Sequence, residues 1–181
     1  SKATTAATLA TVKGVKSIDK LKVSGNVITL KNSALNKKVT VSGGYEFNFA
    51  SDYKNATITG SSNADIITNY GSNVSINTGA GNDSVYNLLG NGYTINAGAG
   101  NDSIYSSGSN HCKINTGAGN DSVYNEWSWD FTINGGAGND LINLNYDSIE
   151  NVIIYKSGDG NDKILGFDGD DTLSIGGGEY S

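Results

Sequence analysis

Apolar residues recur two positions apart in short segments along most of the chain, and glycine-rich segments separate them. The clearest segments are 74–77, 93–96, 112–115 and 131–134, in which the second apolar residue is always isoleucine. A spacing of two is typical of a β-strand with one buried face, whereas a helix needs apolar residues three or four positions apart. The pattern therefore predicts an all-β chain of short strands.

Each of these segments leads into a nine-residue sequence that repeats along the chain. The regular copies are 78–86, 97–105, 116–124 and 135–143, and their aspartates, Asp83, Asp102, Asp121 and Asp140, are 19 residues apart. Looser copies at 60–68, 157–165 and 166–174 contain Asp65, Asp162 and Asp171. A fixed period of this length is typical of a repeat protein, here with the order loop, strand, loop, strand in every unit.

A unit of 19 residues cannot bury its own apolar face, so neighbouring units must stack into a solenoid. In a parallel stack, equivalent residues lie about 4.8 Å apart. We therefore expect two sheets packed back to back. Their inward rows are Ile76, Ile95, Ile114 and Ile133 in one sheet, and Val85, Ile104, Val123 and Ile142 in the other.

The same stacking places the repeat aspartates in one column. Residues 57–181 contain three lysines and fifteen acidic residues, a formal charge of −12. Like charges about 5 Å apart repel by roughly 1 kcal/mol even in water, and a divalent cation between them would convert this repulsion into attraction. Carboxylate and carbonyl oxygens in flexible loops favour Ca²⁺ over Mg²⁺. Zinc and copper are disfavoured because the chain has one histidine and one cysteine.

The repeat resembles the RTX calcium-binding nonapeptide, whose pattern is Gly-Gly-x-Gly-x-Asp-x-apolar-x. The similarity covers roughly residues 59–174, and seven copies make it much more specific than one match. It implies a parallel β-roll, a β-solenoid with Ca²⁺ ions between stacked glycine-rich loops. Each ion would take aspartate carboxylates and loop glycine carbonyls from adjacent turns.

The resemblance also implies which residues bind the metal. They are Asp65; Gly79, Gly81, Asn82 and Asp83; Gly98, Gly100, Asn101 and Asp102; Gly117, Gly119, Asn120 and Asp121; Gly136, Gly138, Asn139 and Asp140; Gly158, Gly160, Asn161 and Asp162; and Asp168 and Asp171. The copy at 60–68 departs from the pattern, with Ser61 and Asn63 where glycine is usual. The loops between the copies lack the motif, so we expect one column of about five ions along one edge for residues 60–140. The copies at 157–174 are expected to place sites on both edges.

The ends of the chain differ from the repeat region. Residues 9–58 alternate like strands without the motif, at 21–23, 27–30, 39–41 and 47–49, and are predicted to form a metal-free N-terminal β cap. Residues 1–8 are expected to be disordered, the roll is assigned to 59–174, and 175–181 form a tail. The apolar run 149–155 is predicted to cap or close the far end.

Two groups of aromatic residues have two interpretations each. Tyr86, Tyr105 and Tyr124 are 19 residues apart and point outward if their neighbours Val85, Ile104 and Val123 point inward. They form either a cross-strand ladder that stabilises the sheet or a platform for a sugar or protein partner. Trp127 and Trp129 either mark a binding surface or cover a turn.

The remaining candidate residues favour a module that is not an enzyme. His111 has no acid–base or zinc partner nearby in the sequence, and Cys112 aligns with Val74, Tyr93 and Phe131 as a core residue. No Gly-x-Ser-x-Gly motif is present. The acidic balance disfavours nucleic-acid binding, and no apolar run is long enough to span a membrane.

These features predict a calcium-binding module of a larger secreted or surface bacterial protein, one that folds when it meets extracellular Ca²⁺. By resemblance, such proteins often leave the cell through type I secretion, as toxins or adhesins. The alternative is an adhesion or carbohydrate-binding accessory module that uses the tyrosines and tryptophans. The isolated chain is expected to be a monomer.

Overall fold

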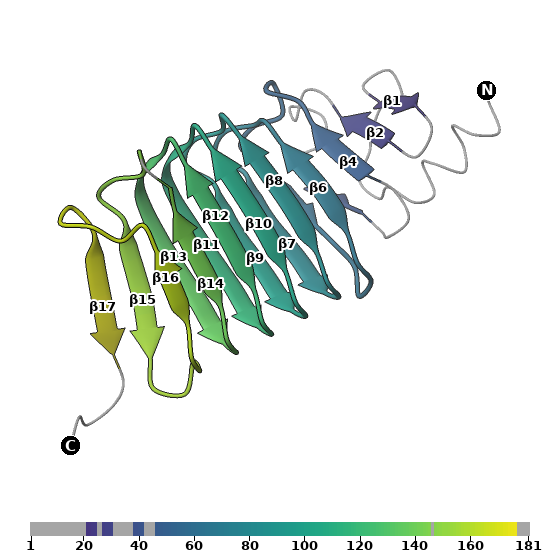
Figure 1. The fold of residues 1–181 in the computed structure, drawn as a ribbon. Coiled ribbons are helices and arrows are strands. Elements are labelled where there is room, and N and C mark those ends of the chain that lie inside the picture. The colour runs from purple at the N-terminus through teal and green to yellow at the C-terminus, as the bar shows by residue number, and fades with distance from the viewer. Residues whose placement is uncertain (1–20, 25–26, 31–37, 42–45, 146, 177–181) are drawn as a thin grey trace.

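The protein is an elongated stack of short strands arranged in two layers, described here from a computed structural model (Figure 1). The structure describes residues 21–24, 27–30, 38–41, 46–145 and 147–176. All described regular structure is β, as predicted, and the described part contains no helix able to cross a membrane. The predicted disorder of residues 1–8 lies outside the described residues.

One layer is a nine-stranded sheet with the order β1-β2-β4-β6-β8-β10-β12-β14-β16. Its strands are β1 (Leu21–Ser24), β2 (Val27–Leu30), β4 (Glu46–Phe49), β6 (Ile66–Asn69), β8 (Ser84–Leu88), β10 (Ser103–Ser107), β12 (Ser122–Glu126), β14 (Leu141–Leu144) and β16 (Lys163–Leu165). The first pair, β1–β2, is antiparallel, and the later pairs in this sheet are parallel.

The other layer is an eight-stranded parallel sheet with the order β17-β15-β13-β11-β9-β7-β5-β3. Its strands are β3 (Lys38–Thr40), β5 (Thr57–Thr59), β7 (Ser75–Ala80), β9 (Thr94–Ala99), β11 (Asn110–Ala118), β13 (Trp129–Ala137), β15 (Val152–Lys156) and β17 (Thr172–Gly176). The chain alternates between the sheets at every strand from β2 onward, which makes a parallel solenoid.

The register of both sheets is the one that the 19-residue period predicts. Ile76, Ile95, Ile114 and Ile133 pair along the eight-stranded sheet, and Val85, Ile104, Val123 and Ile142 pair along the other. All eight side chains are at most 2% exposed. Burying an isoleucine side chain stabilises a fold by roughly 1.5–3 kcal/mol, so these rows are the main apolar contribution to the stack.

The sheets continue without a break across the predicted cap boundary at residue 58. Strands form at or close to all four predicted positions, and Phe47, Phe49, Tyr53 and Ile58 are fully buried in the same core as the repeat strands. That residues 9–58 protect the end of the roll stays a prediction, because much of that segment lies outside the described residues.

The prediction for residues 149–155 is wrong. This run contains β15, which lies inside the eight-stranded sheet, paired with β13 on one side and β17 on the other. An apolar run long enough to serve as a cap is equally suited to an ordinary buried strand. The last strand, β17, is exposed along its whole length.

Candidate metal-binding edge

The chain crosses from the eight-stranded to the nine-stranded sheet along one edge of the solenoid, where the repeat aspartates gather. We call this row of loops, 60–65, 81–83, 100–102, 119–121, 138–140 and 157–162, the carboxylate edge. Each aspartate on this edge stands immediately before a strand of the nine-stranded sheet, so strand register fixes its position. The predicted column of Asp65, Asp83, Asp102, Asp121 and Asp140 is therefore present, and Asp162 extends it.

Hydrogen bonds of one kind connect the column. The Asp65 N–H donates to Asp83 Oδ1 at 2.8 Å, and the Asp83 N–H donates to Asp102 Oδ1 at 2.8 Å. The same bond joins Asp102 to Asp121, Asp121 to Asp140 and Asp140 to Asp162 at 2.7–3.0 Å. Every carboxylate of the column after Asp65 thus uses one oxygen to fasten its own turn to the preceding one, whereas Asp65 Oδ2 accepts from the Ser61 N–H of its own loop at 2.7 Å.

The second carboxylate oxygen is buried and has no hydrogen-bond partner. This holds for Oδ2 of Asp83, Asp102, Asp121 and Asp140 and for Oδ1 of Asp65. These aspartates are at most 3% exposed. A buried carboxylate oxygen without a donor is costly, and one recurs on each of five successive turns. The repetition indicates that a positive ligand belongs there.

Burial and neighbouring charge alter the acidity of the column. Burial raises the pKa of Asp102 to about 6, with the charges of Asp121 and Asp83 adding to the shift and the hydrogen bond from the Asp83 N–H opposing it. Burial likewise raises the pKa of Asp140 to about 6. The pKa values of Asp83 and Asp121 are also raised, again mainly by burial. The protein without a cation therefore favours proton uptake at this edge.

Glycine is required where the loops stack, for two reasons. Gly98 and Gly117 have φ angles of 110° and 108°, which disfavour a residue with a side chain. A Cβ on Gly98 would also overlap the carbonyl oxygen of Gly79, and a Cβ on Gly117 would overlap that of Gly98. The second glycine column, with Gly81, Gly100 and Gly119, is stacked in the same way. Glycine carbonyl oxygens therefore line the edge beside the carboxylates.

The asparagines of the motif occupy a different place from the aspartates. The Asn82 Oδ1 accepts a hydrogen bond from the Asn101 N–H at 2.9 Å, and the Asn101 Oδ1 accepts one from Asn120 at 2.8 Å. The pattern continues through Asn139 to Asn161. These side-chain oxygens already join neighbouring loops at the surface, so the geometry supports a structural role for them.

The donor set suits a hard cation shared between turns. Within the described residues, no three His, Cys, Asp or Glu side chains form a metal-binding group. One carboxylate per turn, supplemented by glycine carbonyls, instead gives an all-oxygen environment that accumulates as turns stack. Oxygen ligands in flexible loops are those that Ca²⁺ takes in proteins. The unpartnered oxygens therefore fit calcium, and the donor set does not fit a soft metal.

The last two copies of the repeat lie on opposite edges. Asp162 belongs to the carboxylate column, whereas Asp171 precedes β17 on the other edge, where its Oδ1 accepts hydrogen bonds from the N–H and the Nδ2 of Asn151, both at 2.9 Å. Asp168 lies in the same turn, and its Oδ1 accepts from the Asp170 N–H at 3.0 Å. Gly158 and Gly160 lie in the loop before Asp162, with φ angles of 95° and 121°.

The opposite edge carries a buried amide ladder that the repeat did not predict. We call the loops 70–74, 89–93, 108–109, 127–128 and 145–151 the amide edge. Asn69, Asn87 and Asn125 are fully buried beside it. The Asn69 Nδ2 donates to Asn87 Oδ1 at 2.6 Å, and the Asn87 Nδ2 donates to Ser109 Oγ at 3.2 Å. The sequence does contain a signal for this ladder. Asn87 is two residues after the inward-facing Val85, so its side chain also faces inward.

The aromatic residues lie as the spacing predicted. Tyr86, Tyr105 and Tyr124 pair across β8, β10 and β12 on the outer face, with 6.5 Å between the first two ring centroids. Trp127 and Trp129 are exposed on the amide edge, at 65% and 47%.

The two remaining candidates have ordinary structural surroundings. Cys112 pairs with Phe131 and is buried, and burial raises the pKa of its thiol to about 11, so it is a core residue as predicted. His111 Nδ1 lies 2.6 Å from Asp130 Oδ2 on the surface of the next turn. The sequence analysis missed this partner, although 111 and 130 differ by the 19-residue period.

The fold and this edge define a class of protein: a parallel β-solenoid with repeated glycine-rich loops that each carry a buried carboxylate. Comparison with protein families identifies the same class of repeat. The family of the RTX calcium-binding nonapeptide repeat matches in four copies, at residues 59–93, 94–110, 132–145 and 155–180. These segments cover about half of the chain. The chain therefore belongs to this family.

A search of curated proteins and a search of solved structures found no match. Residues 111–131, outside the family matches, contain the Asp121 turn in the same register as its neighbours.

Proposed function

We propose that this chain is a calcium-dependent structural module of a larger secreted or surface bacterial protein. The observation that carries the proposal is the buried, unpartnered carboxylate oxygen that recurs on five successive turns. About five Ca²⁺ ions bind along the carboxylate edge, held by the repeat aspartates and by the glycine carbonyls beside them. Bound calcium supplies the positive charge that neutralises the column.

Calcium binding is coupled to folding in this proposal. In the unfolded chain the aspartates are far apart, so only the stacked state offers ligands from two adjacent turns to one ion. A ligand that binds only the folded state stabilises it by mass action. Extracellular calcium modules typically bind at about 10⁻⁴–10⁻³ M. The segment would therefore stay unfolded at cytosolic calcium levels and fold after export.

A structural role accounts for the described carboxylates better than catalysis does. Those of the column are fastened by backbone hydrogen bonds in a regular repeat, and burial raises the pKa of Asp83, Asp102, Asp121 and Asp140 alike. General acid–base catalysis needs two groups whose environments differ. Any activity of the whole protein is accordingly proposed to reside outside this module.

A calcium titration followed by far-UV circular dichroism tests the proposal. The protein is first treated with a chelator, and Mg²⁺ is the control ion. We expect a cooperative gain of β signal with Ca²⁺ and little gain with Mg²⁺ at the same concentration. A chelated protein that is already β-rich, with a melting temperature unaffected by Ca²⁺, would contradict the proposal.

The Asp102→Asn variant sharpens the test because its effect changes sign with calcium. The amide keeps the acceptor for the Asp83 N–H and removes one charge from the column. Without calcium, we expect a higher melting temperature than in the wild type, since repulsion falls. With calcium, two adjacent sites weaken and the titration midpoint rises about tenfold, the effect of losing some 1.4 kcal/mol. Asp147→Asn, at an exposed position on the amide edge, is the matched control and should change neither value.

A further inference from the structure

The outer face of the nine-stranded sheet has a groove at its N-terminal part that the calcium function does not use. The groove has a volume of about 480 Å³ and lies across β4, β6 and β8. Its lining includes Glu46, Asn48, Ile66, Thr68, Tyr70 and Tyr86. Apolar rings and short polar groups are thus mixed in one open depression.

The groove has a largely apolar, exposed lining. Ile66, Tyr70 and Tyr86 are 43%, 39% and 45% exposed, which is high for large side chains clustered on one face. Exposed apolar side chains gathered in a depression are typical of a ligand-binding surface.

A row of tyrosines leads out of the groove. Tyr86 is followed on successive strands by Tyr105 and Tyr124. The Tyr105 hydroxyl donates to Glu126 Oε2 at 2.7 Å, and the Asn145 Nδ2 donates to Glu126 Oε1 at 3.1 Å. These bonds fix the ring and the carboxylate on the outer face. The row is therefore a preorganised aromatic surface that crosses the strands.

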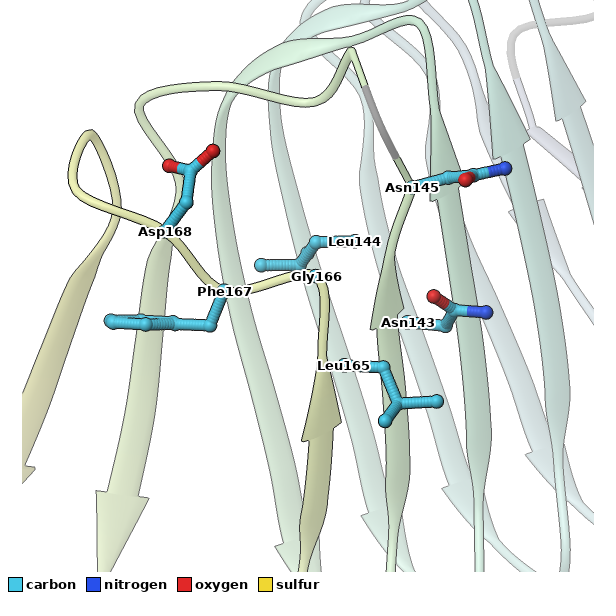
Figure 2. A pocket seen from close by; sticks show the side chains of 7 residues that line it. All are labelled: Asn143, Leu144, Asn145, Leu165, Gly166, Phe167 and Asp168. Carbon is cyan, nitrogen blue, oxygen red and sulfur yellow. The ribbon is translucent and has the colours of Figure 1, made fainter.

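The tyrosine row ends next to a second cavity, which Figure 2 shows from close by. Asn143 and then Leu165 continue the row on β14 and β16. Both residues line this cavity, which has a volume of about 560 Å³ and is also lined by Asn145, Phe167 and Asp168. In Figure 2, the Asn143 and Leu165 side chains lie close together, and Phe167 projects to the other side of the chain.

The charge of this surface restricts what it can bind. The described lining of the two cavities contains Glu46 and Asp168 and no lysine. A polyanion would be repelled, which excludes nucleic acids and polyuronates. The central strands β6 and β8 are paired on both sides, so an extended peptide has no free backbone edge on which to add a strand.

We propose that this face binds a linear, uncharged polysaccharide that lies along the solenoid axis, across the strands. The tyrosine rings stack against the C–H faces of successive sugars, and Thr68 and Asn143 bond to sugar hydroxyls. Strands are about 4.8 Å apart, a distance close to the length of one pyranose unit in an extended chain. One turn of the protein therefore presents one contact position for each sugar unit.

Affinity electrophoresis in gels containing a soluble polysaccharide tests the proposal, with Ca²⁺ present throughout. The neutral probes are hydroxyethylcellulose, mixed-linkage β-glucan, xyloglucan and galactomannan, and polygalacturonate is the anionic comparison. We expect retardation by at least one neutral polymer and none by polygalacturonate. Circular dichroism of the same samples verifies folding, so absence of binding cannot be confused with absence of the calcium-dependent fold.

Substitutions then locate the binding surface. Tyr86→Ala and Tyr105→Ala should each weaken binding about tenfold, as truncation of an interface tyrosine typically does. Trp127→Ala removes an exposed ring on the amide edge and should have no effect.

Three outcomes would overturn the proposal. They are no retardation of the folded protein by any neutral probe, retardation by polygalacturonate alone, and binding that is unchanged in both tyrosine variants. Binding that is lost in Trp127→Ala and retained in Tyr86→Ala would also overturn it, by assigning recognition to the amide edge.

Discussion

The two edges of the solenoid stack successive turns of the chain with different side-chain groups. On both edges the chain must turn between sheets and stack each turn on the one before. On the amide edge, buried Asn69 and Asn87 bond to each other and to neighbouring hydroxyl and carbonyl groups. On the carboxylate edge, the corresponding position is charged, and one oxygen per turn has no partner. An amide brings its own donors, and the amide oxygen that is left without a partner on the amide edge, Asn125 Oδ1, carries no formal charge, whereas each unpartnered carboxylate oxygen belongs to an acidic group.

The backbone shows the same contrast. Left-handed residues on the amide edge include Asn73, His111 and Trp127, with φ angles of 53–57°, which side chains tolerate at modest cost. Left-handed residues on the carboxylate edge are glycines with φ angles of 82–141°. The amide edge is therefore open to varied side chains, and the carboxylate edge is restricted to the repeat. The comparison teaches that the repeated sequence marks the edge for which we propose a bound cation.

The largest expected effect comes from introducing a carboxylate into the amide edge. Asn87→Asp puts a carboxylate in the fully buried amide ladder, where the described structure offers no site for a cation. An uncompensated buried charge costs roughly 3–5 kcal/mol, and we expect that loss in urea unfolding at pH 7.

Calcium should not rescue this variant, in contrast to the carboxylate edge. Asn115→Asp, at an exposed position on the outer face, is the control and should change the free energy of unfolding by less than about 1 kcal/mol. Equal losses in the two variants would mean that the amide ladder has no special role.

A matched pair of glycine substitutions compares the backbone of the two edges. Gly117→Ala combines an unfavourable φ of 108° with an overlap onto the Gly98 carbonyl, and we expect a loss of about 3 kcal/mol. Gly108→Ala on the amide edge has a φ of 63°, and its Cβ would meet the flexible end of Leu89. A loss of about 1 kcal/mol is expected there. Urea unfolding in Ca²⁺ measures both, and a larger loss at Gly108 would refute the contrast.

A further expected effect on the carboxylate edge is a dependence on pH that calcium reverses. The folded-state pKa of Asp102 and of Asp140 is about 6, above the value of about 3.9 for an unfolded aspartate. The folded state therefore binds protons more tightly. Without calcium, its stability is greatest below about pH 4 and falls as the pH rises through 6.

Calcium needs ionised carboxylates, so its affinity should fall as the pH drops through the same range. Melting temperatures from pH 4.5 to 7.5, with and without Ca²⁺, give the two slopes. Slopes of the same sign in both series would show that the column does not titrate as described.

Much of this structure follows from the sequence because the 19-residue period determines which residues of successive turns pair. Once Ile76 and Ile95 are known to stack, the position of every aspartate in the column is fixed, and even Cys112 is placed in the core opposite Phe131. The period also implied contacts that the sequence analysis did not draw, including His111 with Asp130.

What the sequence could not provide is the partner of each polar atom. Asn82 and Asn87 are both asparagines near a turn, yet Asn82 bonds at the surface and Asn87 is fully buried. Their burial differs because Asn87 is on the inward side of β8, whereas Asn82 lies in the loop before that strand. The pocket beside Asn143 depends likewise on where β16 stops, which no repeat pattern marks.

The hydrogen bonds along the aspartate column all point the same way. Each aspartate N–H is satisfied by the turn that follows it in the chain, never by the turn before. The stack is therefore a one-dimensional lattice with a polarity, in which the latest turn always presents an unmatched donor to the next. The two ends of such a lattice are therefore not equivalent, although folding can begin at any turn and propagate to its neighbours, because each turn is stabilised mainly by the turns beside it.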